Sequence, residues 1–396
     1  MSEWETIKLS KCCLSIADGD HQPPPKAGCG VPFITISNMT STNQLDFSDT
    51  LYVPQDYYDS IDTKRRAQKD DILYSVVGSF GIPVYIKEDK EFAFQRHIAI
   101  LRPDTEKIVP RFLYYTMLTR DFYAKADAAA IGAAQRTVSL TSLRNMEINI
   151  PRISYQEKIV SALAAYDDLI EINQKQIKLL EEAAQRLYKE WFVDLRFPGH
   201  EDTKIVDGVP EGWSRKSMEE IAEYLNGYAF KPSDWGEEGK PIIKIKELNE
   251  GVLKETPRNS GEDIPEKYNI HSGNIIFSWS ATLTAKIWDG EDGLLNQHLF
   301  KVTPNSDVSR EFVLQSILKT LDEFRNLTTG STMKHIQRGK LGQVYVLVPT
   351  NDIMTKFEDL SEVYRTQALM LNRNVLILSE ARDRLLPKLM SGEIEV

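Results

Sequence analysis

The second half of this chain repeats the first half at an offset of about 200 residues. The offset is 209 between Trp4 and Trp213 and falls to 198 between Pro151 and Pro349. A falling offset is expected when the loops of two copies differ in length. A duplicated unit usually performs one task at two places. The repeat therefore predicts two similar domains with related roles.

The strand-like and helix-like runs of the two copies follow the same order. A chain of 396 residues exceeds what one hydrophobic core usually supports, so two or more domains are expected. In the first copy a helix over 111–126 follows Pro110, which suits a helix start. The first copy has strand-like runs over 31–37, 71–77, 82–87 and 97–103, and its closing segment 132–151 ends in a strand. In the second copy, 241–248 matches the first of these runs and 274–280 matches 71–77. The helix expected over 311–324 matches that over 111–126, and 330–349 matches the closing segment.

Each copy ends in a long helix with heptad-like apolar spacing. The two helices are expected over about 156–192 and 353–386, and the first would span about 54 Å. Because each helix follows its own head and neither is stable alone, we expect them to pair antiparallel. Asn173 is the one polar member of the first series, and either fixes the helix register or lies at the seam edge in water. The apolar series are Ile159, Leu163, Tyr166, Ile170, Ile177, Leu180, Ala184, Leu187 and Trp191, and Phe357, Leu360, Tyr364, Leu371, Leu378, Ala381 and Leu385.

These patterns predict an α+β fold, in which two repeated α/β domains are joined by two long antiparallel coiled-coil helices. The expected segments are a first head over 1–152, a helix over 153–195, a linker over 196–212, a second head over 213–350 and a helix over 351–396.

The composition favours a reduced, cytoplasmic protein. No run of about 18 apolar residues is present, and the first ten residues are acidic and polar rather than signal-like. The three cysteines, Cys12, Cys13 and Cys29, are odd in number and crowded, which argues against a disulfide framework.

The net charge of −10 restricts nucleic-acid binding, because proteins that hold DNA alone usually carry a basic surplus. Three interpretations remain open. The chain does not bind nucleic acid, or its basic residues are grouped on one face, or a partner chain supplies much of the phosphate contact.

In the order of its parts, the chain resembles the specificity subunits of type I restriction-modification systems. The residues that carry the resemblance are LLPKLMSGEI (385–394), GVPEGW (208–213), DDILYS (70–75) and GSTMKHI (330–336). The resemblance implies a non-catalytic subunit in which each head, a target recognition domain, reads one half of a split DNA sequence and the helices set the spacer. It further implies two modification subunits that bind S-adenosylmethionine and methylate adenine N6. Two restriction subunits that use ATP and Mg can join them.

The expected dimensions agree with a split DNA target. DNA repeats about every 34 Å, so two half-sites about one turn apart lie on one face of the duplex. One turn less the half-sites leaves a spacer of about 5–8 base pairs. Because the two copies differ between 18–26 and 226–235, the target is expected to be asymmetric.

Two equivalent stretches without acidic residues, 128–146 and 324–351, are the first candidates for DNA contact. In an acidic protein such stretches are typical of a phosphate-facing surface, although a solvated turn is the alternative. Their candidate residues are Gln135, Arg136 and Arg144 in the first copy, and Lys334, His335, Gln337, Arg338 and Lys340 in the second.

A second candidate pair precedes a strand in each copy. It comprises Gln95-Arg96-His97 and Asn296-Gln297-His298, of which Arg96, His97, Gln297 and His298 are candidate DNA contacts. The alternative is that the shared histidine caps the strand. Tyr228 could stack on a base, or pack inside its own domain.

Other functions have weaker support. The Asp71 and Glu88-Asp89-Lys90 set, which would suit a nuclease, is not repeated in the second copy. Cofactor-binding and phosphate-binding loops are missing, and Cys12, Cys13, His21 and Cys29 fit no standard zinc spacing. No catalytic, cofactor or metal residue is therefore assigned to this chain. Two alternatives remain: the specificity chain of a type IIB-like system, and a coiled-coil adaptor whose heads bind protein.

Overall fold

A computed structural model describes residues 4–19, 24–40, 42–78, 80–132, 135–253, 255–280, 283–326 and 338–396. The chain divides into two compact units. Unit 1 comprises Met1–Glu171 and Leu376–Val396, and unit 2 comprises Ile172–Val375. Each unit thus contains one head and a part of both long helices. The linear domain boundaries given above stay a prediction, because the compact units divide each long helix.

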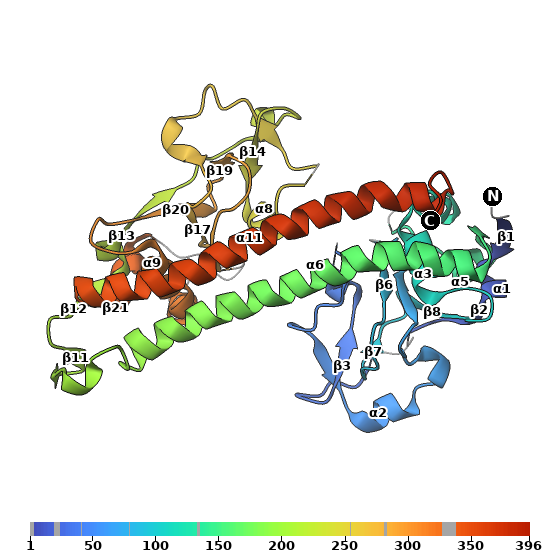
Figure 1. The fold of residues 1–396 in the computed structure, drawn as a ribbon, viewed down its shortest axis with the longest axis horizontal. Helices are drawn as coiled ribbons and strands as arrows, with labels where there is room; N and C mark the ends of the chain where they lie inside the picture. Colours follow the sequence, from blue (N-terminus) through green and yellow to red (C-terminus); the bar gives the residue numbers. More distant parts are fainter. Residues whose placement is uncertain are drawn as a thin grey trace. The chain divides into compact units, whose positions relative to one another are not determined.

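The head of unit 1, part of which is labelled in Figure 1, is built on an antiparallel sheet. Its strand order is β2-β8-β5-β6. A smaller sheet, β4-β3-β7, and a terminal pair, β1-β9, complete it. The strands are β1 (Glu5–Lys8), β2 (Cys13–Asp18), β3 (Val31–Ile34), β4 (Leu51–Val53), β5 (Ile72–Ser75), β6 (Pro83–Tyr85), β7 (Ala93–Phe94), β8 (Ile98–Pro103) and β9 (Glu147–Ile150). The helices are α1 (Leu9–Cys12), α2 (Gln55–Ser60), α3 (Pro110–Leu118), α4 (Arg120–Ala129) and α5 (Leu140–Asn145), with a 3-10 turn η2 (Thr63–Arg65).

The head of unit 2 repeats this plan, with sheets β13-β20-β17-β18, β15-β14-β19-β16 and β12-β21. A short hairpin of β10 (Ile205–Val206) and β11 (Val209–Pro210) precedes it. Its strands are β12 (Ser214–Ser217), β13 (Ala222–Asn226), β14 (Lys240–Ile243), β15 (Arg258–Asn259), β16 (Asn269–Ile270), β17 (Ile275–Ser278), β18 (Thr284–Ile287), β19 (Gly293–Leu295), β20 (Leu299–Pro304) and β21 (Tyr345–Val348). Its helices are α7 (Met218–Ile221), α8 (Ile245–Glu250), α9 (Arg310–Lys319) and α10 (Leu321–Asn326), with a 3-10 turn η7 (Arg338–Gln343). The predicted α+β fold with two repeated heads is confirmed.

The helix expected over 111–126 is in fact two helices, α3 and α4. Thr119 between them is extended (φ −71°, ψ 149°), and its hydroxyl accepts a hydrogen bond from the Phe122 amide. This is an N-cap, and it starts a new helix where apolar spacing alone predicts continuity. The matching helix of unit 2 is also divided, at Thr320.

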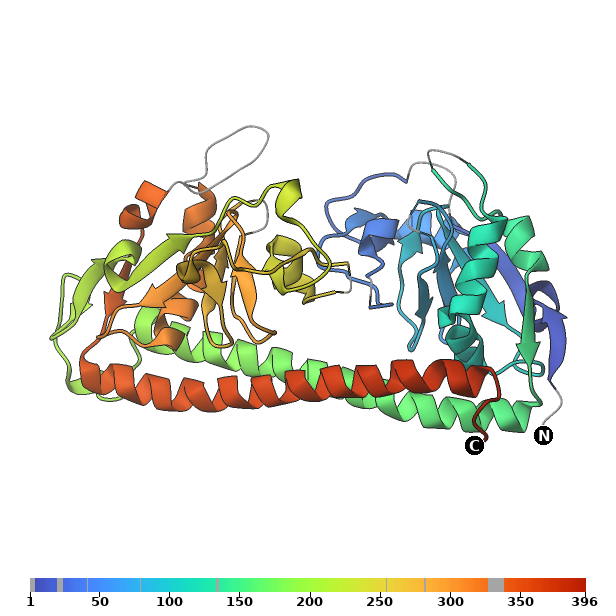
Figure 2. The same cartoon turned by 90° about the horizontal axis from the view of Figure 1, so that it is seen from above.

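Within unit 1 the long helices α6 (Ile153–Tyr188) and α11 (Asn351–Met390) lie side by side and antiparallel (Figures 1 and 2). The Tyr155 hydroxyl reaches the carbonyl of Ile394, and Asp167 pairs with Arg382. A later residue of α6 therefore meets an earlier residue of α11. Ile159 and Leu163 of α6 share one core with Leu386 and Leu389 of α11 and with the head.

Within unit 2 the end of α6 meets the start of α11 through an aromatic cluster. α6 continues into a π-helical turn, Lys189–Val193. The ring of Phe357 lies 4.9 Å from that of Phe192 and 6.1 Å from that of Trp191, measured between centroids. Phe192 also contacts Phe312 of α9 at 5.0 Å, so the cluster joins both helices to the head.

The predicted apolar series of α6 is largely buried, while the series of α11 contains one error. Ile159, Leu163, Ile170, Ile177, Ala184 and Trp191 are buried. On α11, however, Leu360 is exposed and Ser361 is buried in its place. The Ser361 hydroxyl donates to the carbonyl of Phe357, which satisfies it within the helix. Asn173 is half-buried, and its role in register stays a prediction.

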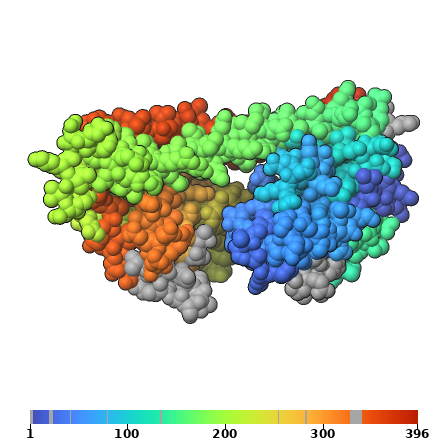
Figure 3. Space-filling model, turned by 90° about the horizontal axis from the view of Figure 1, so that it is seen from below, coloured from blue at the N-terminus to red at the C-terminus, as the bar shows by residue number. Residues whose placement is uncertain are grey.

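Part of α6 lies at the surface (Figure 3). Among its apolar side chains, those of Leu169, Ile172 and Leu179 are exposed. α11 likewise exposes Leu360, Val363 and Met370. Exposed leucines, valines and isoleucines at these spacings are typical of a surface that another helix can cover.

Candidate nucleic-acid interface

The candidate residues of unit 1 meet at one edge of the four-stranded sheet. In the antiparallel register Asp18 faces Ala99, and Ser75 faces Ile98. The end of β2, the start of β8 and the end of β5 therefore lie together. The turn Gln95–His97, which precedes β8, falls at this edge, which we call the reading edge of unit 1.

The loop that holds Gln135 and Arg136 joins the same edge through the segment Val76–Gly78. The Val76 amide donates to the His97 carbonyl at 2.9 Å, and the Gly78 amide donates to the Arg136 carbonyl at 3.0 Å. The Val138 amide returns to the Val76 carbonyl at 2.9 Å. Two candidate groups that are far apart in the sequence are thus held on either side of one short segment.

The charged groups at the edge of unit 1 are exposed but already paired in part. Arg136 forms an ion pair with Asp127, and both side chains are 43% exposed. The Arg136 guanidinium also lies 5.5 Å from the Phe80 ring. An exposed ion pair is worth about 0–1 kcal/mol, so a phosphate can compete for this arginine. Gln135 and Arg96 are exposed.

His97 is half-buried at the same edge. Burial, together with the neighbouring charge of Arg96, lowers the pKa of His97 below its usual range. The imidazole is therefore neutral at pH 7, with one donor and one acceptor nitrogen. A neutral ring of this kind suits the edge of a base better than a phosphate.

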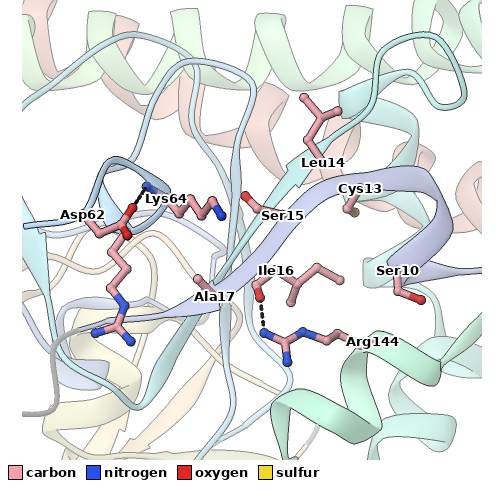
Figure 4. A pocket seen from close by; sticks show the side chains of 10 residues that line it. Ser10, Cys13, Leu14, Ser15, Ile16, Ala17, Asp62, Lys64 and Arg144 are labelled. Atoms are coloured by element: carbon pink, nitrogen blue, oxygen red, sulfur yellow. Dashed lines mark hydrogen bonds between the residues drawn. The ribbon is translucent and has the colours of Figure 1, made fainter.

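The structure places Arg144 elsewhere. It lies on α5, and its guanidinium donates to the Ile16 carbonyl of β2 at 2.6 Å. It lines a cleft with Ser10, Cys13 and Lys64, among others, and not the reading edge (Figure 4).

Two glycines at matching positions, Gly19 and Gly227, allow two backbone segments to approach closely at each reading edge. A Cβ on Gly19 would lie 2.2 Å from the Phe94 carbonyl oxygen, and one on Gly227 would lie 2.1 Å from the Asn296 carbonyl oxygen. Both distances are shorter than any real contact of a Cβ, so neither position accepts a side chain without a shift of the backbone. The repeat of Gly19 at Gly227 is a sequence signal for this site.

We expect Gly19→Ala to destabilise unit 1 by about 1–3 kcal/mol, because the added methyl group collides with backbone that cannot move aside freely. The matched control is Gly28→Ala, where a Cβ would have nothing within 4 Å. Thermal unfolding of the two variants measures the difference. Equal melting temperatures would show that the edge adapts at no cost.

The reading edge of unit 2 has the same frame and different side chains. Asn226 faces Phe300, and Ser278 faces Leu299, so the turn Asn296–His298 lies beside the end of β17. The His298 ring lies 5.9 Å from that of Trp279, between centroids. The side-chain amide nitrogen of Gln297 is 3.5 Å from His298 Nε2.

Trp279 is a residue that the sequence reasoning missed. Its indole N–H donates to Asn226 Oδ1 at 3.1 Å, and its ring is half-buried at the edge. The matching residue of unit 1 is Val76, since Ser278 matches Ser75. The signal was present in the aligned runs NIIFSWS and DILYSVV, where a large aromatic residue replaces a small one.

Tyr228 belongs to the edge through its backbone more than through its ring. Its amide donates to the Leu295 carbonyl, and its carbonyl accepts from the Gln297 amide at 2.9 Å. The ring packs on Phe230 at 4.9 Å and on Tyr268 at 5.5 Å. This placement agrees with packing inside the domain, and base stacking by Tyr228 stays a prediction.

Most of the candidate residues in the second acid-free stretch lie outside the part of the chain that the structure describes. Lys334, His335 and Gln337 lie outside the described residues, as does the side chain of Arg338. Lys340 is in η7, and its ammonium group donates to Gln343 Oε1 at 3.3 Å. The DNA-binding roles of these residues stay predictions.

Comparison with known proteins also finds one domain twice in this chain. The family model described as the type I restriction modification DNA specificity domain matches residues 1–182 and 210–373. The chain belongs to this family.

Known specificity subunits resemble the chain over most of its length. The MjaIX specificity subunit of Methanocaldococcus jannaschii is 26% identical over 308 residues, which cover 73% of this chain and 70% of that protein. The HindI specificity subunit of Haemophilus influenzae is 22% identical and covers 84% and 88%. A type I restriction-modification S subunit from M. genitalium has a TM-score of 0.54 at 14% identity, covers 98% of this chain and 96% of that one, and so supports the fold.

The described part of this specificity-family chain contains no helix that is both long enough and apolar enough to span a lipid bilayer. Its longest helices, α6 and α11, carry charged residues throughout.

Proposed function

We propose that each head of this specificity subunit reads one half of an asymmetric, split DNA target, and that the helix pair sets the spacer between the halves. The observation that carries the proposal is the repeated reading edge. The same backbone frame occurs in both units, whereas the side chains on it differ. The shared backbone structure agrees with two heads that bind the same kind of molecule, DNA. The different side chains agree with two half-sites of different sequence.

The side chains at the two edges have the chemistry of base readout. Unit 1 presents Gln95, His97 and Gln135, whose amide and imidazole groups both donate and accept hydrogen bonds. Unit 2 presents Gln297 and His298 in the matching turn. Trp279 adds an aromatic ring there, where unit 1 has the buried side chain of Val76. The half-site read by unit 2 is therefore expected to differ from that of unit 1.

Arg96 and His97 are expected to contribute in different ways, although they are neighbours. Arg96→Gln should weaken binding to every DNA sequence and reduce the slope of log affinity against log salt by about 0.9, the value for one phosphate contact. His97→Gln should leave that slope unchanged at pH 7, because the lowered pKa keeps the imidazole neutral, and should alter base preference in one half-site. Fluorescence anisotropy over a salt series distinguishes them, and equal slope changes would refute this division.

The lowered pKa of His97 also has a consequence for stability. Near pH 6 the unfolded chain binds more protons at this residue than the folded head does. The contribution of His97 to stability therefore falls as the pH is lowered below about 6.5.

Partner subunits are proposed to supply the catalysis. Two modification subunits would cover the exposed apolar side chains of α6 and α11, such as Leu179 and Met370. They would bind S-adenosylmethionine and methylate adenine N6. Restriction subunits that use ATP and Mg would join them in the cutting assembly. The chain itself would act without catalysis, in the cytoplasm, where DNA and these partners are found.

Methylome sequencing with and without this chain tests the proposal. We expect one split motif with unequal halves, separated by about 5–8 base pairs, to lose adenine methylation when the chain is deleted. If no split motif disappears, or if the motif that disappears is a palindrome, the proposal is wrong.

A further inference from the structure

A basic cleft lies along the outer side of β2 in unit 1 (Figure 4). Its volume is about 460 Å³. β2 is the edge strand of its sheet, so its outer backbone groups face this cleft instead of another strand. The walls are η2 on one side and α5 on the other. Its lining includes Ser15, Ile16, Asp62, Lys64, Arg65 and Arg144.

Three cations from two separate elements converge on this cleft, against one carboxylate in its lining. Lys64 and Arg65 come from η2, and Arg144 comes from α5. Figure 4 shows the Lys64 ammonium directed toward the Ser15 hydroxyl. Lysine, arginine and hydroxyl donors together are the groups that bind phosphate oxygens in protein–DNA complexes. Such a local surplus is notable in a chain with a net charge of −10.

The cleft is close to the reading edge of unit 1. Arg65 pairs with Asp18 at 3.6 Å, and Asp18 is the last residue of β2, immediately before Gly19 of the edge. From Ser15 to Asp18 the strand advances about 10 Å. The major groove of DNA is about 12 Å wide. If the reading edge contacts bases in that groove, the DNA backbone at the side of the groove lies about as far from the edge as the cleft does.

The matching positions of unit 2 have different chemistry. Lys64 corresponds to Lys267, but Arg65 corresponds to Tyr268, whose ring packs on Tyr228. Arg144 corresponds to Gly342, where a Cβ would lie 3.1 Å from a carboxylate oxygen of Glu219. One cation of the three therefore remains in the described part of unit 2.

We propose that this cleft binds a backbone phosphate of DNA beside the half-site read by unit 1, and that unit 2 has no equivalent contact among its described residues. The proposal rests on the proposed function, because it assumes that unit 1 binds DNA. It adds Lys64 and Arg65, which lie outside the stretches singled out in the sequence, to Arg144, which lies in one of them. It also predicts that the two heads make different numbers of contacts with the DNA backbone.

The test uses the full chain assembled with its modification subunits and two duplexes, one with the methylated motif and one without it. The double variant Lys64→Gln/Arg65→Gln should bind both duplexes about tenfold more weakly, with a salt slope smaller by about 0.9. The ratio of the two affinities should not change, because a phosphate contact carries no sequence information. Lys267→Gln in unit 2 is the matched control and should change affinity by less than about twofold.

Three outcomes distinguish the possibilities. If the unaltered assembly binds neither duplex, the proposed function fails. If it binds but the double variant keeps its affinity and salt slope, the cleft inference fails and the proposed function stands. A changed affinity ratio at constant slope would also overturn the inference, since the cleft would then read bases. Unchanged thermal unfolding of the double variant excludes misfolding as the cause of a loss.

Discussion

Replacing Phe357 with alanine is expected to destabilise unit 2 by about 3–5 kcal/mol. Phe357 is fully buried and contacts Tyr188, Trp191 and Phe192, so it holds the start of α11 against the end of α6. Truncation removes apolar contacts and leaves a cavity between two helices that cannot close over it. Five of the six tryptophans of the chain lie in unit 2, so urea unfolding followed by tryptophan fluorescence reports mainly on this unit.

Met370→Ala on the same helix is the matched control. Met370 is 63% exposed, and methionine and alanine both favour helices, so the change should stay within about 0.5 kcal/mol. A similar loss of stability in both variants would mean that the aromatic cluster does not hold the helix pair together.

Asp167→Asn is expected to cost unit 1 about 2–3 kcal/mol. Asp167 of α6 accepts from the Tyr115 hydroxyl at 2.6 Å and from Arg382 of α11 at 3.0 Å, and Arg111 of α3 lies 3.5 Å away. The side chains of Asp167, Arg111 and Arg382 are 13%, 17% and 25% exposed. Breaking a fully buried pair costs about 3–5 kcal/mol, and partial exposure reduces this.

The neighbouring Asp168 provides the control for this prediction. Its side chain is 57% exposed and pairs with Arg111 at the surface, so Asp168→Asn should cost less than about 1 kcal/mol. Hydrogen exchange of the α3 and α6 peptides measures both variants locally. Equal protection in the two variants would contradict a central role for Asp167.

The position that matches Asp167 in the second copy is Arg365, so the charge is reversed there. Arg365 lies 4.0 Å from Glu311 of α9, which is buried, and it also pairs with Glu362. Each head is thus attached to its helices by a charged group, but with the acid and the base exchanged. The two copies therefore both have a charged residue at this position, but its charge is opposite.

The frame of the fold could be predicted from the sequence because it depends on periodicity. The apolar spacing of Ile159, Leu163 and Ile170 identified the buried side of α6, and short strand-like runs identified β5, β8 and β17. The break at Thr119 was missed because a cap depends on one side-chain hydrogen bond and not on spacing. The burial of Ser361 instead of Leu360 depends on how two helices meet, which neither helix specifies alone.

The candidate site could be predicted in part. The repeat located His97 and His298 correctly at matching edges, because their strands are shared. It could not reveal that the His97 turn and the loop of Gln135 and Arg136 both hydrogen-bond to the Val76–Gly78 segment, since these pairings join residues far apart in sequence. It grouped Arg144 with Arg136 by composition, whereas the fold directs Arg144 to β2. Lys64 and Arg65 were missed because their cleft exists only in three dimensions.

The most direct measurement of the central claim, one head for each half-site, is the methylome of a strain that carries Gln95→Ala, Arg96→Ala and His97→Ala together. These changes affect the reading edge of unit 1 and leave unit 2 and the helices intact. We predict that base specificity relaxes in one half of the methylated motif, while the other half and the spacer length stay unchanged. Altered specificity in both halves, or an unchanged motif from a folded and assembled variant, would contradict the account.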